Sequence, residues 1–127
     1  MSKVLIVDDH RDSSAVLARL LRAEGHEPQI ATDPVEAMDH IRNEPPDAML
    51  LDVMMPGISG LDVLRQIKQN PDTAQVPVVM FRAISRPEVI DQAFNQGASD
   101  YWVKASLDFG QMMARLSRIL PRNRAAC

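Results

Sequence analysis

The sequence has little of what holds small secreted or membrane-embedded domains together. Cys127, the last of the 127 residues, is its single cysteine, so no disulfide can form within the chain and no pair of cysteines can bind a metal. No stretch approaches the roughly 20 apolar residues of a membrane span, and the N-terminus has no long apolar segment of the signal-peptide kind. We therefore expect a cytoplasmic protein that makes no membrane contact.

The chain also lacks the excess positive charge of a nucleic-acid-binding domain. Its net charge is −3 and its pI about 5.5, which argues against direct nucleic-acid binding. Hydrophobic residues make up 46% of the sequence, and no Gly- or Ser-rich linker interrupts them, so one domain can bury a sizeable core. We expect that domain to cover residues 1–121, with residues 122–127 as a tail or the start of a linker.

Short apolar runs alternate with segments of helical period. The runs are too short for helices and are typical of strands buried on both faces, while the weaker run at 27–31 contains Pro28, which an edge strand tolerates. We expect strands at 4–7, 27–31, 48–51, 76–81 and 101–103. Five helices should follow these strands. The first should end before Gly25 and the second before Pro45, and the other three should cover 61–68, 87–96 and 107–120.

Several helix boundaries carry recognisable signals. Asp33 followed by Pro34 predicts a cap and a first helical position, and Ser59 would cap the third helix. Gly25 and Gly97 would end the helices before them. Because parallel strands are joined by right-handed helical crossovers, the sequence predicts an α/β fold, a flavodoxin-like, doubly wound (βα)5 three-layer sandwich. Its parallel five-stranded sheet would have the strand order 2-1-3-4-5.

Charged side chains stand where three of the apolar runs end. Asp8 and Asp9 follow the first strand, Asp52 follows the third, and Lys104 follows the last. In such a sheet the carboxyl ends of the strands face one crevice, so these groups should converge. Crowded carboxylates favour a hard cation such as Mg²⁺, and the ammonium group favours an anion. A phosphoryl group on Asp52 would satisfy both.

Each of these residues also has a plain structural explanation. Asp52 could form a turn, Lys104 could be a solvated surface lysine, and the pair Asp8 and Asp9 could cap the first helix, although Asp12 could serve that purpose as well. Context favours chemistry, because Asp52 precedes a turn-forming stretch that would leave its carboxylate at the rim of the sheet. A carboxylate can attack phosphorus and form an acyl phosphate if a metal ion and a lysine balance the charge.

Three segments that carry these charges resemble the receiver domain of bacterial two-component response regulators, and the resemblance covers nearly the whole chain. They are residues 4–9, 50–57 and 97–104. The resemblance implies that Asp52 takes a phosphoryl group from a histidine kinase or phosphotransfer protein and becomes an aspartyl phosphate. It also implies that Asp8, Asp9, Asp52 and the Met54 carbonyl hold Mg²⁺, directly or through water. Lys104 would contact the phosphoryl group.

Two positions depart from the family's pattern. The family usually has threonine or serine before an alanine, but here Arg82 precedes Ala83, so the switch hydroxyl is missing, while Tyr101 matches the aromatic that changes rotamer on activation. Ala105 replaces the proline that follows the lysine. A cis bond before a non-proline residue costs about 3 kcal/mol, so we expect the bond before Ala105 to be trans. Both departures favour a reduced, slow or absent response to phosphorylation, because this chemistry depends on exact positioning.

The Arg82 guanidinium has three alternatives. It could reach a phosphoryl oxygen, pair with Asp52 before phosphorylation, or extend into solvent. The three histidines, His10, His26 and His40, are scattered without a second ligand at helical spacing, so we assign them no metal role, and His10 would only tune the local field.

The sequence therefore predicts a signalling domain and not an enzyme, one that promotes its own phosphorylation and dephosphorylation. Phosphorylation would shift the population of states and so change contacts with a downstream effector protein or output domain. The alternative is a receiver-like interaction module that acts independently of phosphate. An aspartate-nucleophile phosphatase or dehalogenase is disfavoured because Asp8 and Asp9 are adjacent, and a flavodoxin because no phosphate-cradling loop follows the first strand. The sequence is compatible with a homodimer through the last helices.

Overall fold

The structure is a computed structural model, and it describes residues 2–55, 58–82, 86–104 and 106–120. Ala83 and Ala105, on which two expectations rest, lie outside these residues. Strands and helices alternate along the chain: β1 (Lys3–Val7), α1 (Arg11–Ala23), β2 (Glu27–Ala31), α2 (Pro34–Asn43), β3 (Ala48–Asp52), β4 (Met54–Met55), β5 (Ile58–Ser59), α3 (Gly60–Gln69), β6 (Val78–Arg82), α4 (Pro87–Asn95), β7 (Asp100–Val103) and α5 (Phe109–Ile119).

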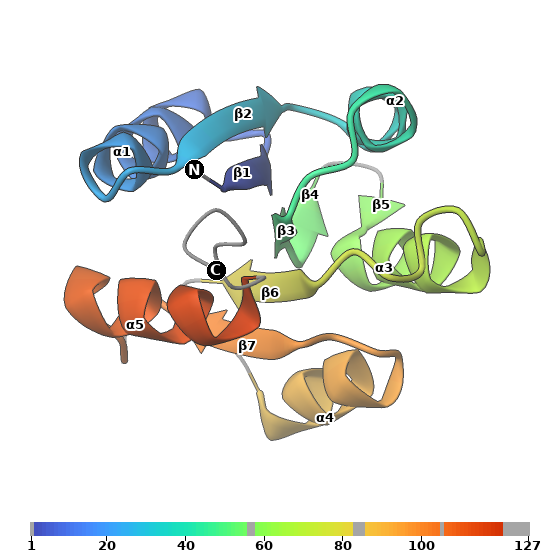
Figure 1. Ribbon diagram of the computed structural model, residues 1–127. Helices are drawn as coiled ribbons and strands as arrows, with labels where there is room; N and C mark the ends of the chain where they lie inside the picture. The colour runs from blue at the N-terminus through green and yellow to red at the C-terminus, as the bar shows by residue number, and fades with distance from the viewer. Residues whose placement is uncertain (1, 56–57, 83–85, 105, 121–127) are drawn as a thin grey trace.

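The main sheet is parallel, with the order β2-β1-β3-β6-β7. Helices α1 and α5 lie on one side of it, and α2, α3 and α4 lie on the other (Figure 1). This is the predicted doubly wound three-layer sandwich, and the predicted strand order is confirmed. The described helices are too short and too polar to span a bilayer.

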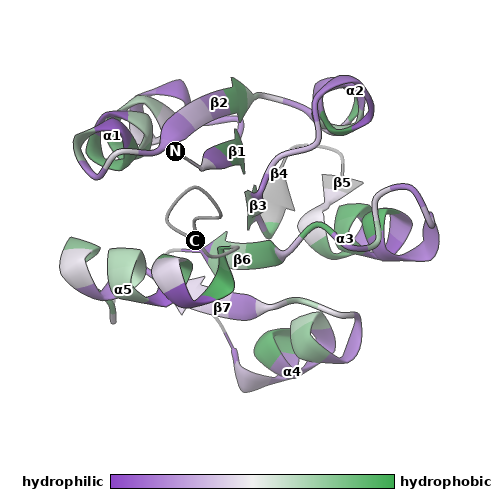
Figure 2. Cartoon of the chain, viewed as in Figure 1, coloured by the Kyte–Doolittle hydropathy of each residue, from purple (hydrophilic) through white to green (hydrophobic). Residues whose placement is uncertain are grey.

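Apolar residues cover both faces of the sheet, as the continuous apolar runs of the sequence predict. Alternate residues of the central strands pack toward α2–α4 or toward α1 and α5, which gives two buried clusters on opposite faces. Figure 2 shows the consequence: the central strands are largely hydrophobic, and the helices turn their hydrophilic sides outward. The sheet therefore forms a rigid platform, and its carboxyl edge positions the site described below.

Most helix boundaries agree with the signals in the sequence. The Asp33 side chain accepts a hydrogen bond from the Glu36 backbone N–H at 2.8 Å, and the Ser59 hydroxyl accepts one from the Leu61 N–H at 3.2 Å. Gly25 and Gly97 follow helix ends with φ of 86° and 103°, values that favour glycine. These four residues fix where the connections to the sheet begin and end.

Three details differ from the predictions. The fourth strand of the main sheet begins at Val78 and not at Val76, because the Val76 N–H bonds to the Thr73 carbonyl in a turn. Asp12 does not cap the first helix: the N-cap residue is His10, and Asp12 lies in the first turn. The antiparallel pair β4–β5 is an addition, since its two-residue strands are too short to give a periodic signal.

Candidate functional site

The register of the sheet brings Asp8 and Asp52 side by side. β1 and β3 pair in parallel with Val7 opposite Leu51, so Asp8 and Asp52 are the next residues on neighbouring strands. Side chains alternate along a strand, and the residues two positions earlier pack toward α1 and α5, so both aspartates continue that row. Asp8 is 2% exposed and Asp52 8% exposed. Two carboxyl groups are therefore buried at one edge of the sheet.

Asp9 and His10 complete a cluster with these aspartates. One ligand atom from each of Asp8, Asp9, His10 and Asp52 lies within 4.8 Å of all the others. Asp9 Oδ1 is buried and has no hydrogen-bond partner. The Nδ1 atom of His10 lies 3.2 Å from this oxygen, which is close enough for an ion pair. Oxygen donors that converge, one of them without a hydrogen bond, fit a divalent cation.

The negative charge of the cluster acts on His10. Its Nδ1 lies 3.3 Å from Asp8 Oδ1. The hydrogen bond to Asp8, followed by the charge of Asp9, raises the pKa of the His10 imidazole above its usual value. A protonated His10 therefore balances part of the carboxylate charge.

Asp8 also has a structural role. Its Oδ1 accepts the backbone N–H of His10 at 3.0 Å, and its own N–H donates to the Ala31 carbonyl at 3.1 Å. The carboxylate thus shapes the turn from β1 into α1, which is close to the capping explanation considered for the acidic pair. The Asp8 carboxylate therefore both stabilises this turn and belongs to the acidic cluster.

Lys104 follows β7, the edge strand on the far side of β3 from β1. Phe81 lies opposite Asp52 on the neighbouring strand, and Trp102 lies opposite Phe81 on the next. The Lys104 Nζ lies 4.5 Å from the centroid of the Phe81 ring, a cation–π distance. Asp8, Phe81, Trp102 and Lys104 line one open cleft of about 370 Å³, whose remaining walls come from α1 and α5. Lys104 therefore lines the same cleft as Asp8, one member of the acidic cluster.

Arg82 and Tyr101 occupy the positions of the expected switch. Arg82 ends β6, is partly exposed, and its carbonyl accepts the Lys104 N–H at 2.9 Å. Tyr101 is 5% exposed and belongs to the buried cluster on the α2–α4 side. Ala83 and the bond before Ala105 lie outside the described residues.

The chain after Asp52 returns closely onto the strand it has left. Met54 in β4 pairs with Ser59 in β5, and the Gly60 N–H donates to the Val53 carbonyl at 2.7 Å. A Cβ atom on Gly60 would lie 2.1 Å from the Asp52 carbonyl oxygen, which is far inside van der Waals contact. Only glycine fits there. Because Gly60 begins α3 and bonds to the Val53 carbonyl, it holds the segment between them, which contains Met54, against β3.

Replacing Gly60 by alanine is expected to lower the free energy of unfolding by about 1–3 kcal/mol, as for other overpacked sites. The added methyl group must push β3 and α3 apart, and the measurement is urea denaturation followed by circular dichroism. Gly110→Ala in α5 is the matched control, because a Cβ there meets its nearest atom, Asp108 Oδ1, at 3.4 Å. That control should be stabilised by up to about 1 kcal/mol through helix propensity. Equal stability of the Gly60→Ala protein and the parent would contradict the close approach.

The structure brings together Asp8, Asp9 and Asp52 as the sequence predicts, and it adds His10. The sequence predicts no metal role for His10, because no second ligand stands at helical spacing, whereas the structure places one of its ring nitrogens in the cluster. The available signal was simpler: His10 directly follows the acidic pair, in the turn that the Asp8 carboxylate shapes. Gly60 was missed because only the tertiary approach of α3 to β3 reveals its importance.

Comparison with known proteins agrees with this architecture. A family profile described as "Response regulator receiver domain" matches residues 4–117. The response regulator MprA of Mycobacterium sp. (strain KMS) is 36% identical over 120 residues, covering 94% of this chain and 51% of MprA. The phosphate regulon transcriptional regulatory protein PhoB of Rhizobium meliloti (strain 1021) is 32% identical over 122 residues, covering 96% of this chain and 53% of PhoB. The chain thus spans about half the length of these relatives.

A solved structure shows the same fold. The chemotaxis protein CheY4 of Vibrio cholerae superposes with a TM-score of 0.86 at 26% identity, covering 94% of this chain and 99% of CheY4. The family match begins in β1 and ends in α5, so it includes every strand of the main sheet. From these matches, this chain belongs to the receiver domains of two-component response regulators.

Proposed function

We propose that this receiver domain accepts a phosphoryl group on Asp52, with Mg²⁺ held by Asp8, Asp9, Asp52 and the Met54 carbonyl. The observation that carries the proposal is the convergence of the Asp8, Asp9 and Asp52 carboxylate oxygens within 4.8 Å of one another, together with a cleft that Asp8 and Lys104 both line. A buried Asp9 oxygen without a hydrogen bond supports a cation there. When bound, Mg²⁺ would offset the charge of the carboxylates and of the phosphoryl oxygens.

The transfer is a substitution at phosphorus. An Asp52 carboxylate oxygen attacks the phosphorus atom and forms the acyl phosphate, while the bond from phosphorus to the donor atom breaks and its electron pair leaves with the donor. Lys104 contributes a point charge to the phosphoryl oxygens, since its ammonium group carries three donors on a flexible stem. Attack of water on the acyl phosphate later releases inorganic phosphate and restores the carboxylate.

The proposed partners follow from this chemistry. The donor is a sensor histidine kinase or a phosphotransfer protein, and the responder is an effector protein or an output domain. We place the exchange in the cytoplasm. Phosphorylation adds charge that only some arrangements around Lys104 neutralise, so it shifts the population toward those arrangements. Arg82 in β6 and Tyr101 in β7 lie on neighbouring strands beside Lys104. The register pairs Arg82 with Val103, two residues after Tyr101.

The test is the covalent addition itself. Incubation of the chain with acetyl phosphate and Mg²⁺ should add the mass of one phosphoryl group, measured by intact-protein mass spectrometry, and chelation with EDTA should prevent the addition. The physical reason is that the like charges of donor and site repel each other unless a cation offsets them. No added mass, under conditions that label another receiver domain in parallel, would remove the proposal.

Arg82 favours a second candidate function, an interaction module that acts independently of phosphate, because no hydroxyl stands at the end of β6. Amide hydrogen exchange separates the two functions. A phosphorylation switch should change protection in α4, β7 and α5 after treatment with acetyl phosphate and Mg²⁺, whereas an independent module should give one pattern with and without treatment.

A further inference from the structure

We propose that His10 Nδ1 is a further ligand of the cation site, so that a divalent transition-metal ion of the Co²⁺, Ni²⁺ and Zn²⁺ class competes there with Mg²⁺. The inference rests on the carboxylates of the proposed function. It adds a nitrogen donor to what is otherwise a set of oxygen donors, and that addition changes the class of metal that the site prefers.

The backbone of His10 is fixed on both sides. Its N–H donates to Asp8 Oδ1 at 3.0 Å, and its carbonyl accepts both the Ser14 N–H at 3.0 Å and the Ser14 hydroxyl at 2.9 Å. As the N-cap residue of α1 it cannot move away without breaking the first turn of that helix. The His10 backbone, from which the imidazole extends, is therefore held at the acidic edge of the sheet.

The ring nitrogen points into the cluster. Nδ1 lies 3.3 Å from Asp8 Oδ1 and 3.2 Å from Asp9 Oδ1, so the same ring edge faces both carboxylates. Two ligands of one octahedral ion with bonds of 2.0–2.1 Å lie at most about 4.2 Å apart. The four candidate ligand atoms of Asp8, Asp9, His10 and Asp52 lie within 4.8 Å of one another, so a small contraction brings all four onto one ion.

A separate observation points to an ion at this place. Asp9 Oδ1 is buried and accepts no hydrogen bond, although buried carboxylate oxygens are normally satisfied. The His10 Nδ1 lies 3.2 Å from this oxygen, the His10 side chain is 70% exposed, and its imidazole can exchange a proton for a metal ion. An ion between the two would satisfy both groups.

The donor set decides the metal class. Carboxylates suit Mg²⁺, Ca²⁺ and Mn²⁺, whereas imidazole suits Zn²⁺, Ni²⁺ and other transition metals, and affinity for mixed sites generally rises along the series from Mn²⁺ to Cu²⁺. Mg²⁺ gains little from a nitrogen ligand because it is a hard cation that prefers oxygen. The contribution of His10 should therefore appear in the affinity for transition metals and be nearly absent in the affinity for Mg²⁺.

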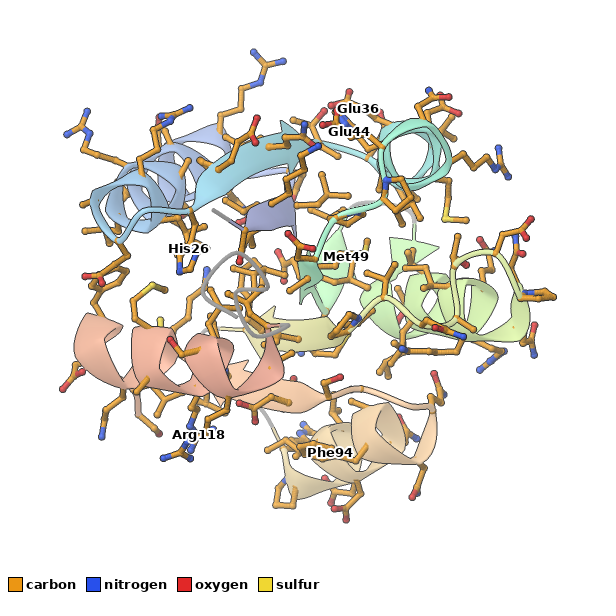
Figure 3. The ribbon with its side chains drawn as sticks, viewed as in Figure 1. His26, Glu36, Glu44, Met49, Phe94 and Arg118 are labelled. Atoms are coloured by element: carbon orange, nitrogen blue, oxygen red, sulfur yellow. The ribbon has the colours of Figure 1, made fainter. Side chains whose placement is uncertain are left out.

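His26 offers a matched control. It precedes β2, so it lies at the amino end of the parallel sheet, while His10 follows β1 at the carboxyl end. His26 is labelled in Figure 3, and among the described residues it belongs to no group of three or more potential metal ligands. Replacing it removes one imidazole without touching the acidic cluster.

The experiment is calorimetric titration of the full chain, without an affinity tag, with NiCl₂ and separately with MgCl₂. His10→Asn keeps a good N-cap residue, so α1 should remain intact, which thermal melting by circular dichroism verifies. The Ni²⁺ dissociation constant should rise at least about tenfold while that of Mg²⁺ stays within about twofold. His26→Asn should match the parent for both ions. The visible absorption of bound Co²⁺ should shift in the His10→Asn protein alone.

Two results would overturn the inference. Unchanged Ni²⁺ affinity in the His10→Asn protein means that the imidazole is no ligand, and an equal loss of Ni²⁺ and Mg²⁺ affinity means that His10 only positions Asp8. Failure of the proposed function is distinguishable, because metal binding is measured without phosphodonor. A parent that binds Ni²⁺ through His10 but takes no phosphoryl group from acetyl phosphate keeps the inference and removes the phosphorylation.

Discussion

Replacing Asp52 by asparagine should abolish phosphoryl uptake from acetyl phosphate, with a loss of at least about 1000-fold in rate, as expected when a nucleophile is removed. The amide has nearly the same shape as the carboxylate but no anionic oxygen to attack phosphorus. It also removes one of the carboxylates in the cluster, so the affinity for Mg²⁺ should fall as well. Intact-protein mass spectrometry and Mg²⁺ titration measure the two effects.

Asp62→Asn is the control for this change. Asp62 lies in the first turn of α3, its side chain is 54% exposed, and it pairs with Arg65 at 3.8 Å, so it shares the net charge change but not the site. It should label like the parent. Full labelling of the Asp52→Asn protein would mean that another side chain accepts the phosphoryl group, and the acidic cluster would then need a different explanation.

The main sheet was predictable because its strands are simple patterns. β1 and β3 are short and buried, and a run of apolar residues without alternation has few other interpretations in an α/β chain. The helix boundaries at Asp33 and Ser59 follow from local hydrogen bonds that their side chains make, so the sequence alone predicts them. Local rules and global topology agree in these elements.

Other boundaries depend on contacts that the sequence does not display. β6 begins late because Val76 belongs to a turn, and Pro77 has no N–H to give to a ladder, although its carbonyl accepts the Met49 N–H at 2.9 Å. The pair β4–β5 exists because α3 must start directly beside the Asp52 carbonyl, and that constraint arises from tertiary packing. Strands of two residues are too short to show a periodic pattern in the sequence.

The acidic part of the site could be predicted for a geometric reason, and its histidine could not. Asp8 directly follows β1 and Asp52 ends β3, the neighbouring parallel strand, so the strand order alone brings them together. The position of His10 depends instead on the conformation of a single turn, in which Asp8 accepts the His10 N–H and thereby directs the imidazole toward Asp9. The sequence therefore predicts that the aspartates lie close together, but it does not predict which way the His10 imidazole points.

The cleft combines two opposing electrostatic demands. Asp8, which lines it, belongs to an acidic cluster that favours a cation, while an incoming phosphoryl group requires positive charge on a separate side chain. Lys104 meets the second demand because the Phe81 ring lies beneath its ammonium group and the Arg82 carbonyl fixes its backbone. Metal binding and phosphoryl contact should therefore be separable by substitution.

Replacing Lys104 by methionine tests that separation. The side chain keeps its length and apolar stem but loses the charge, so phosphoryl uptake from acetyl phosphate should slow by roughly 10- to 100-fold, the value of one hydrogen bond to a charged group. The affinity for Mg²⁺ should stay equal or rise, because an ammonium group that shares the cleft with Asp8 repels a cation. Labelling time courses by mass spectrometry and calorimetric titration with Mg²⁺ check the two halves.

Lys104→Arg serves as the charge-preserving comparison. Its planar guanidinium presents donors in a fixed fork and cannot reproduce the compact ammonium over the Phe81 ring, so it should recover only part of the labelling rate. Parent-like labelling of the methionine variant would show that Lys104 is a solvated surface lysine, as the plain structural explanation holds. A parallel fall in Mg²⁺ affinity would instead mean that the Lys104 side chain supports the acidic cluster, so that metal binding and phosphoryl contact are not separable.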